Sequence, residues 1–206
     1  HLFSIPVIKD SSFSFINLQN DLFFSEKLQN TGRGRNYGID LMLEKYISKG
    51  YYYLLSASVF NAEYKGGDNV WRDTRFNRNY VFNFLIGKEW QMGKDKQNTF
   101  SLNTRLSYQG GNRYSPINEA ASLIAKDVVY DETRAFAIQN DPVLNAHFTA
   151  IYKINKKKRS SEIALKILNL TGQPDFRGHQ YNQVKNTIDE ELATVVIPNL
   201  SYKIEF

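Results

Sequence analysis

The sequence predicts an all-β protein, an antiparallel up-and-down transmembrane β-barrel. Two observations predict this fold class. Apolar and polar residues alternate along most of the chain, and a period of two is the side-chain period of a strand. Short and long connections alternate between these segments along the chain. A bacterial outer-membrane barrel has the same arrangement, with short turns at one end and long outer loops at the other.

The composition is compatible with this fold. A chain of 206 residues can form one domain with a sizeable core, and the absence of cysteine excludes a disulfide framework and thiolate chemistry. Hydrophobic residues make up 42% of the chain and the mean hydropathy is −0.47. A membrane barrel has such values because only alternate residues face lipid. No run approaches the ~20 apolar residues that a membrane helix needs.

Residues 1–31 are the least readable part of the chain, and we expect a strand end and an outer loop there. Phe13, Phe15 and Ile16 are expected in a strand, and Asn20-Asp21 is expected in a turn. Residues 1–6 lack the basic and apolar regions of a signal peptide. We therefore expect a mature polypeptide, or a fragment that begins within a longer one.

The net charge of +5 and the isoelectric point of about 9.2 suggest nucleic acid as a candidate partner. The basic residues are spread along the chain, however, and the one dense cluster, residues 156–159, lies between two strand-like segments. A solvated turn explains that cluster, so we expect no nucleic-acid binding.

Hairpins are expected over residues 32–206. The predicted strands are 37–44, 51–60, 79–86, 100–109, 147–154, 162–167 and 198–206. The last strand alternates most cleanly, with Leu200, Tyr202, Ile204 and Phe206 on one face. In the strand 100–109, Asn103, Arg105 and Ser107 lie opposite the apolar residues and are expected to line the lumen.

The connections alternate strictly in length. Short turns are expected near Lys49, Lys94 and Lys157, and long connections around Arg72, Asp127 and Gly178. All short turns then lie at one end of an up-and-down barrel, where the last strand also ends. In the connection from 110 to 145, Ser115-Pro116 predicts the N-cap and first position of a short helix.

No catalytic constellation is present. The three histidines lie far apart on different elements, without the spacing of metal ligands. We expect no enzyme activity, no cofactor and no metal. Trp71, Arg72 and Arg75 form the loop cluster that we predict to contact a ligand, since Trp and Arg are favoured at binding surfaces. The alternative is a loop that packs on itself.

Several segments together resemble a known family. They are Gly32–Leu41 with Lys49–Tyr52, Tyr64–Asp68, Gly110–Pro116, Val129–Asp131, Leu168–Thr171 and Ile197–Phe206. In this order they resemble the C-terminal barrel portion of TonB-dependent outer-membrane receptors of the Bacteroidetes type. The aromatic end of the last strand is similar to the signal that the barrel assembly machinery reads in outer-membrane proteins.

The resemblance implies the C-terminal segment of a larger barrel, with about seven or eight of about 22 strands. It implies a bacterial outer-membrane receptor that binds a scarce nutrient, such as a siderophore, a glycan or a peptide, and imports it. The partners implied are outer-membrane lipid, the barrel assembly machinery, and the remainder of the barrel with its plug, which would precede His1. The TonB complex would act only through those preceding parts. Whether a surface lipoprotein binds to the outer loops is left open.

Two alternatives remain open from the residues alone. One is a self-contained eight-stranded outer-membrane barrel with a structural or adhesion role, since about eight strands suffice for a closed barrel. The other is a soluble β-rich binding module, which the segregated connections disfavour.

Overall fold

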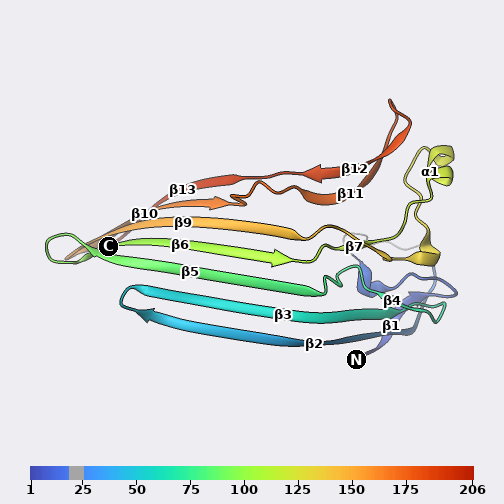
Figure 1. The fold of residues 1–206 in the computed structure, drawn as a ribbon, viewed down its shortest axis with the longest axis horizontal. Coiled ribbons are helices and arrows are strands. Elements are labelled where there is room, and N and C mark those ends of the chain that lie inside the picture. The colour runs from blue at the N-terminus through green and yellow to red at the C-terminus, as the bar shows by residue number, and fades with distance from the viewer. Residues whose placement is uncertain (19–25) are drawn as a thin grey trace.

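A large antiparallel sheet dominates the computed structural model, which describes residues 1–18 and 26–206. The expected turn at Asn20-Asp21 lies outside the described residues. The sheet has nine strands, eight of which follow one another across it in chain order (Figure 1). These eight are β1 (Leu2–Ile8), β2 (Leu28–Ser48), β3 (Tyr51–Lys65), β5 (Tyr80–Met92), β6 (Asn98–Gln109), β9 (Val143–Lys156), β10 (Arg159–Leu168) and β13 (Ile197–Glu205).

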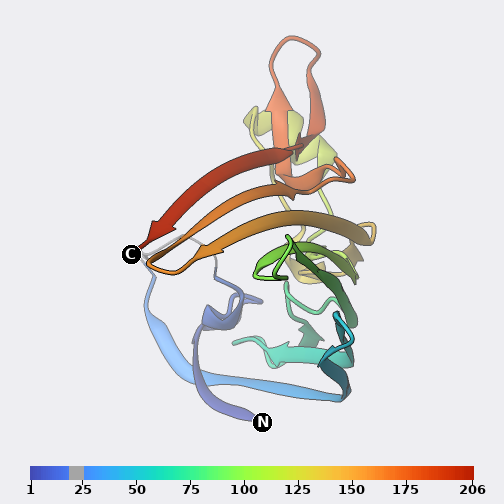
Figure 2. The same ribbon diagram turned by 90° about the vertical axis from the view of Figure 1, so that its left-hand side faces the viewer.

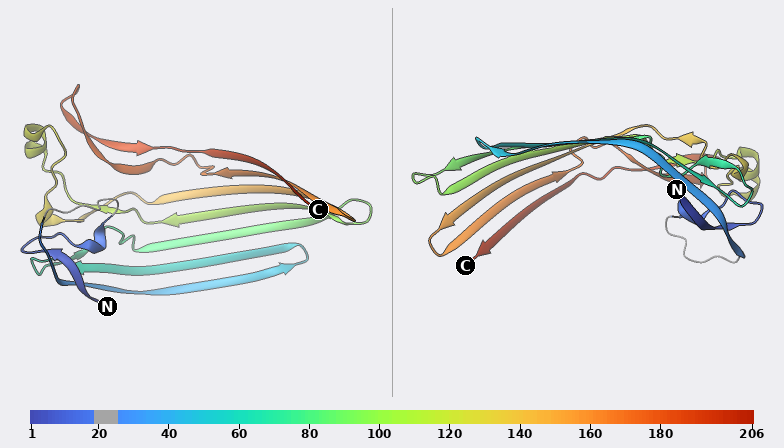
Figure 3. Two further views of the ribbon diagram at one scale, coloured as in Figure 1. Left: turned by 180° about the vertical axis from the view of Figure 1, so that it is seen from behind. Right: turned by 90° about the horizontal axis from the view of Figure 1, so that it is seen from below.

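The predicted alternation of connections is confirmed. Two or a few residues join β2 to β3, β5 to β6 and β9 to β10. The longer segments 66–79, 110–142 and 169–196 join β3 to β5, β6 to β9 and β10 to β13. Figure 3 shows the three short turns and the C-terminus at one end of the sheet, with the long connections at the other. The end of β13 therefore lies with the short turns, as expected.

The sheet is curved and open, and no closed barrel is formed by the described residues (Figure 2). Its two edges are β1, which pairs with β2, and β13, which pairs with β10. The prediction of a large antiparallel β-sheet is thus confirmed, and closure into a barrel stays a prediction.

The strand registers divide the sheet into two faces, because directly paired residues of antiparallel strands point to the same side. Leu55 pairs with Leu43 and Phe84, and Leu106 continues the row on β6. The face that these residues share is called the convex face. The same registers assign further residues to the convex face: Tyr37, Ile39, Leu41, Val59, Phe82, Ile86, Leu102, Phe148, Leu165, Leu200 and Tyr202.

The opposite, concave face is mixed but mainly polar. Asn103 pairs with Thr149, and Ser107 pairs with Asn83 and Asn145. Leu54 and Leu85 are exceptions that pair with each other on this face. Apart from such exceptions the strands alternate, and the register also brings like faces of successive strands together.

The N-terminal segment lies inside the curve of the sheet (Figure 2). It covers Gly32 and Gly34 on the concave face: a Cβ on Gly32 would lie 2.5 Å from a methyl of Val7. Val7 and Tyr64 are fully buried here, so this end of the sheet holds the small core. The strand expected around Phe13 to Ile16 is wrong, because η1 (Phe15–Asn17) is a 3₁₀ turn and the strand β1 lies earlier.

The long connections hold more structure than expected. β4 (Trp71–Asp73) pairs antiparallel with the end of β3, and β7 (Arg113–Tyr114) pairs with β8 (Ile138–Gln139). The third connection forms a hairpin of β11 (Asp175–Asn182) and β12 (Thr187–Ala193), where only a polar connection was expected.

The predicted helix exists, but its predicted start is wrong. Helix α1 spans Glu119–Ala125, and Asn118 is its N-cap because its side chain accepts from the backbone N–H of Ala121. Ser115 is buried before the helix, where its hydroxyl oxygen accepts from the N–H of Phe136. A 3₁₀ turn, η2 (Glu132–Arg134), follows.

Candidate functional site

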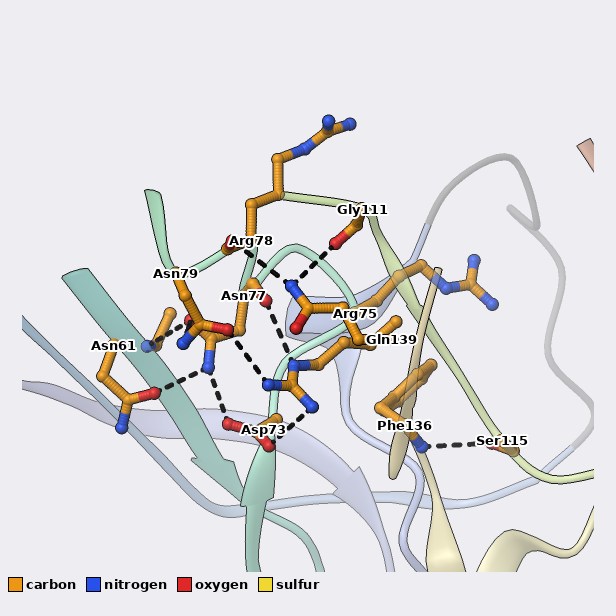
Figure 4. Close-up of polar contacts among 12 residues, drawn as sticks. Asn61, Asp73, Arg75, Asn77, Arg78, Asn79, Gly111, Ser115, Phe136 and Gln139 are labelled. Atoms are coloured by element: carbon orange, nitrogen blue, oxygen red, sulfur yellow. Dashed lines mark hydrogen bonds and ion pairs between the residues drawn. The ribbon is translucent and has the colours of Figure 1, made fainter. Parts of the chain in front are cut away.

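Asn77 organises the end of the sheet that carries the long connections (Figure 4). Its side chain is fully buried and makes four hydrogen bonds, the longest of which comes from Asn79 Nδ2 at 3.5 Å. Its Oδ1 accepts from the N–H of Ala62 at 3.0 Å, and its Nδ2 donates to Asn61 at 2.7 Å and to Asp73 at 2.6 Å. One residue thus joins β3, β4 and the connection 66–79.

Arg113 extends this network to the next connection. Its guanidinium pairs with Asp73 at 3.1 Å and donates to the carbonyl of Asn77 and the side chain of Asn79. Gln139 donates to the carbonyl of Arg78 at 3.3 Å. The two connections therefore form one hydrogen-bonded layer above the strand ends.

The predicted ligand cluster is largely engaged within this layer. Arg72 pairs with Asp68 at 2.6 Å and donates to the carbonyl of Thr133. Burial alone would raise the pKa of Asp68, but the hydrogen bonds from Arg72 and from the N–H of Val70 hold it below its ordinary value. The hydrogen bond with Asp68 raises the pKa of Arg72. This pair stabilises the loop.

Trp71 and Arg75 lie apart from each other within the layer. The guanidinium of Arg35 stacks 4.4 Å from the ring centre of Trp71, whereas that of Arg75 lies 5.4 Å from the ring centre of Phe136. The structure therefore does not bring Trp71, Arg72 and Arg75 together around a common cavity. Their contact with a ligand stays a prediction.

A polar cavity of about 690 Å³ lies beside this layer, and the sequence did not reveal it. Such a volume falls in the range of small-molecule sites, about 300–1,000 Å³. Its lining combines strand ends with the second and third long connections. Seven lining residues carry neutral amide side chains: Gln109, Asn112, Gln139, Asn140, Asn145, Asn169 and Gln173. Because each amide both donates and accepts, the cavity suits a ligand with many polar groups.

Two features of the lining favour an occupant. Asn112 Oδ1 is buried and has no hydrogen-bond partner among the described residues, and an unpaired buried acceptor is costly. Arg78 also lines the cavity. Burial lowers the pKa of Arg78, which Asp175 partly offsets. The lining thus includes one residue with an unpaired buried acceptor, Asn112, and one partly desolvated cation, Arg78.

An aromatic cluster closes one side of the cavity. The His179 ring lies 4.9 Å from Tyr114, 5.0 Å from Phe176 and 6.1 Å from Tyr130, measured between ring centres. Tyr114 and Phe176 belong to the cavity lining. These contacts attach the hairpin β11–β12 to the connection 110–142. Long-range pairing of this kind left no signal in the local sequence pattern.

The residues predicted to line a lumen share the concave face. Asn103 accepts a hydrogen bond from the hydroxyl of Tyr52, and Arg105 lies 3.4 Å from His147 across β6 and β9. His147 also lines the cavity, so the concave face and the cavity are continuous there. Ser107 lies on the same face. Whether that face borders a lumen stays a prediction.

The convex face exposes large apolar side chains. Ile39 is 78% exposed, Leu200 75% and Tyr202 63%. Ile204 lies on the same face and Phe206, just beyond the last strand, is 97% exposed. The four residues predicted as an assembly signal are therefore accessible, although recognition of them stays a prediction.

Two rows of aromatic residues border this face. Tyr80 and Tyr108 pair near the long connections, with ring centres 5.6 Å apart. Trp90 stacks on Phe100 near the short turns, with ring centres 5.7 Å apart. The apolar band of the convex face lies between the two rows.

Comparisons with protein-family models, curated proteins and solved structures found no match to this chain. In the part of the chain that the structure describes, no helix is long and apolar enough to cross a membrane. Within the same residues, no cluster of His, Asp and Glu side chains could hold a metal ion.

Proposed function

We propose that this chain forms part of the wall of an outer-membrane β-barrel receptor that binds a polar nutrient at its outer end and imports it. The observation that carries the proposal is the continuous apolar convex face, which seven strands build in register. A soluble protein rarely exposes apolar patches beyond a few hundred Å². Lipid, in contrast, is the natural environment of such a face.

The height of the apolar band supports the proposal. Tyr80 and Trp90 lie ten residues apart on β5, which is about 34 Å along a strand, and a tilt of about 40° reduces this to about 26 Å across a bilayer. Outer-membrane barrels carry an apolar band of about 25 Å between aromatic girdles. The two aromatic rows correspond to these girdles.

The open edges require a partner for the sheet. β1 pairs with β2 only as far as Gly34, so among the described residues the rest of β2 and the outer side of β13 have no partner strand. Their unpaired backbone groups would face hydrocarbon, where no water can satisfy them. We infer that other strands of the same receptor close the barrel. The family resemblance gives the same arrangement, with the barrel remainder and a TonB-gated plug in a larger polypeptide.

The cavity at the outer end is the proposed ligand contact. Its amide-rich lining comes from the long connections and the adjoining ends of β6 and β9, which would lie toward the outside of the cell. Because the concave face continues from His147 along Arg105 and Asn103, a ligand released from the cavity would meet a polar lumen. Trp71, Arg72 and Arg75 would hold the surrounding layer rather than the ligand itself.

Cell fractionation with measurement of intact mass tests this proposal. An antibody against residues 110–145 should detect the polypeptide in outer membranes after urea washing, released only by detergent, at a mass several times 23.9 kDa. Recovery without detergent would contradict the membrane assignment. A detergent-dependent polypeptide near 23.9 kDa would instead favour a small closed barrel or a separately encoded piece, and would contradict import by this chain alone.

A further inference from the structure

The short-turn end of the sheet is basic where it meets the convex face. The three short turns contain five lysines and one acidic residue: Lys49, Lys94, Lys96, Lys157, Lys158 and Asp95. Lys45 and Lys88 add two cations on the convex face itself. Positive charge therefore gathers just beyond the aromatic row of Trp90 and Phe100, which lies near the short turns.

Lys88 is held against aromatic rings at the border of the apolar band. Its Nζ lies 4.2 Å from the ring centre of Tyr51 and 4.9 Å from that of Trp90, and it donates a hydrogen bond to the Tyr51 hydroxyl. These contacts fix the ammonium at the edge of the apolar surface. None of the ion pairs found within residues 1–18 and 26–206 involves Lys45, Lys49 or Lys88.

A second cavity of about 490 Å³ lies at this place. Lys49, Lys88 and Trp90 line it, together with Glu89. Glu89 belongs to the concave row, since it pairs with Ser101, whereas Lys88 and Trp90 belong to the convex face. The cavity thus joins two cations to an apolar aromatic surface.

We propose that this cavity binds the headgroup phosphate of an anionic phospholipid whose acyl chains lie on the convex face. The proposal rests on the proposed membrane location. Charge complementarity argues for this occupant, because ammonium groups attract anionic headgroups strongly when they lie at the membrane surface. The aromatic rings argue for a lipid rather than a soluble anion, since they place the cations at the depth of the headgroups.

Native mass spectrometry of the receptor purified from outer membranes in mild detergent tests the proposal. After exchange into equal phosphatidylglycerol and phosphatidylcholine, we expect preferential retention of phosphatidylglycerol. Lys49→Gln with Lys88→Gln should lower that preference about fivefold for each lysine. Lys49→Arg with Lys88→Arg should keep it, because the charge remains. Lys185→Gln, at the tip of the hairpin β11–β12, is the control and should leave it unchanged.

Three results would overturn the lipid site. These are equal retention of both lipids by the unaltered receptor, an unchanged preference in the double glutamine variant, and displacement of phosphatidylglycerol by excess inorganic phosphate, which would indicate a site for free phosphate. The proposed function fails separately: it fails if the polypeptide needs no detergent, whereas a detergent-dependent receptor without lipid preference contradicts only the lipid site.

Discussion

At the scale of single residues, Asn77 has the largest structural role in the layer of long connections. A buried amide with its hydrogen bonds made tolerates no shorter side chain, because truncation removes its bonds to Asp73, to Asn61 and to the N–H of Ala62.

We predict that Asn77→Ala destabilises this layer by about 1–3 kcal/mol, the cost of buried polar groups left unsatisfied. Hydrogen exchange of residues 61–79 and 110–142 measures the effect as faster exchange. Asn30→Ala, at an exposed position of β2, is the matched control and should leave the exchange unchanged. Equal exchange in both variants would contradict the central role of Asn77.

A second prediction at this scale concerns the two faces of β6. Leu106 lies on the convex face in the middle of the apolar band, and its neighbour Ser107 lies on the concave face. Arginine in place of Leu106 should cost about 2–4 kcal/mol near the bilayer midplane. Heat-modifiable mobility of the outer-membrane fraction should show less assembled protein for Leu106→Arg than for Ser107→Arg. Equal amounts would mean that the convex face does not contact lipid.

At the scale of elements, the hairpin β11–β12 depends on His179. Burial among aromatic rings lowers the pKa of His179, an effect that Glu190 partly opposes. The folded hairpin therefore favours the neutral ring. As the pH falls through about 6.5, the ordinary pKa of histidine, the unfolded hairpin binds a proton more readily than the folded one. Stability contributed by this packing is present above that pH and declines below it.

Hydrogen exchange of 175–182 and 187–193, corrected for the intrinsic pH dependence, should accordingly rise at pH 5 relative to pH 7.5. His179→Gln should abolish the difference because glutamine does not titrate. A pH dependence that survives in the variant would assign the effect to a group other than His179.

The last strand gives a prediction of a different kind. Phe206 is almost fully exposed and follows the end of β13, so its removal costs the sheet little packing. Deletion of Phe206 should nevertheless reduce the amount of receptor in the outer membrane severalfold, while the thermal stability of the receptor that does assemble stays the same. Unchanged assembly would rule out Phe206 as part of a recognised signal.

Elements with strong period-two alternation could be predicted from the sequence, and the others could not. β6 and β13 have one apolar and one polar face, and this pattern determines a strand whatever lies beside it. β11 and β12 pair mainly through polar residues, so their formation depends on contacts such as that of His179 with Tyr114, which are distant in sequence. β1 contains Pro6, which lacks a donor and is tolerated at a sheet edge.

The candidate site was harder to predict than the sheet. Trp71 and the arginines near it stood out by residue type, yet Arg72 is committed to Asp68 and Arg75 to Phe136. The cavity is formed by asparagines and glutamines that are unremarkable in any single loop. Only the pairing of β6 with β9, which are separated by more than thirty residues, brings Gln109 and Asn145 to one place.

At the scale of the whole molecule, three properties follow the long axis of the sheet. Connections are short at one end and long at the other, lysines gather at the short-turn end, and the polar cavity lies at the opposite end. Across the large sheet, a mainly apolar convex face is opposite a mainly polar concave face. A barrel wall that separates lipid from a wet lumen, with the ligand site outside, explains both the axial and the transverse asymmetry.

The lipid contact of individual positions on β5 tests this account most directly. The chain contains no cysteine, so single cysteines can be placed at Asn83, Phe84, Leu85 and Ile86, labelled with a fluorophore in the native receptor, and exposed to brominated lipids. The account predicts quenching at 84 and 86 and little at 83 and 85. Leu85 is decisive because it is apolar yet lies on the concave face. Strong quenching at Leu85, or equal quenching at all four positions, would contradict a membrane wall with these faces.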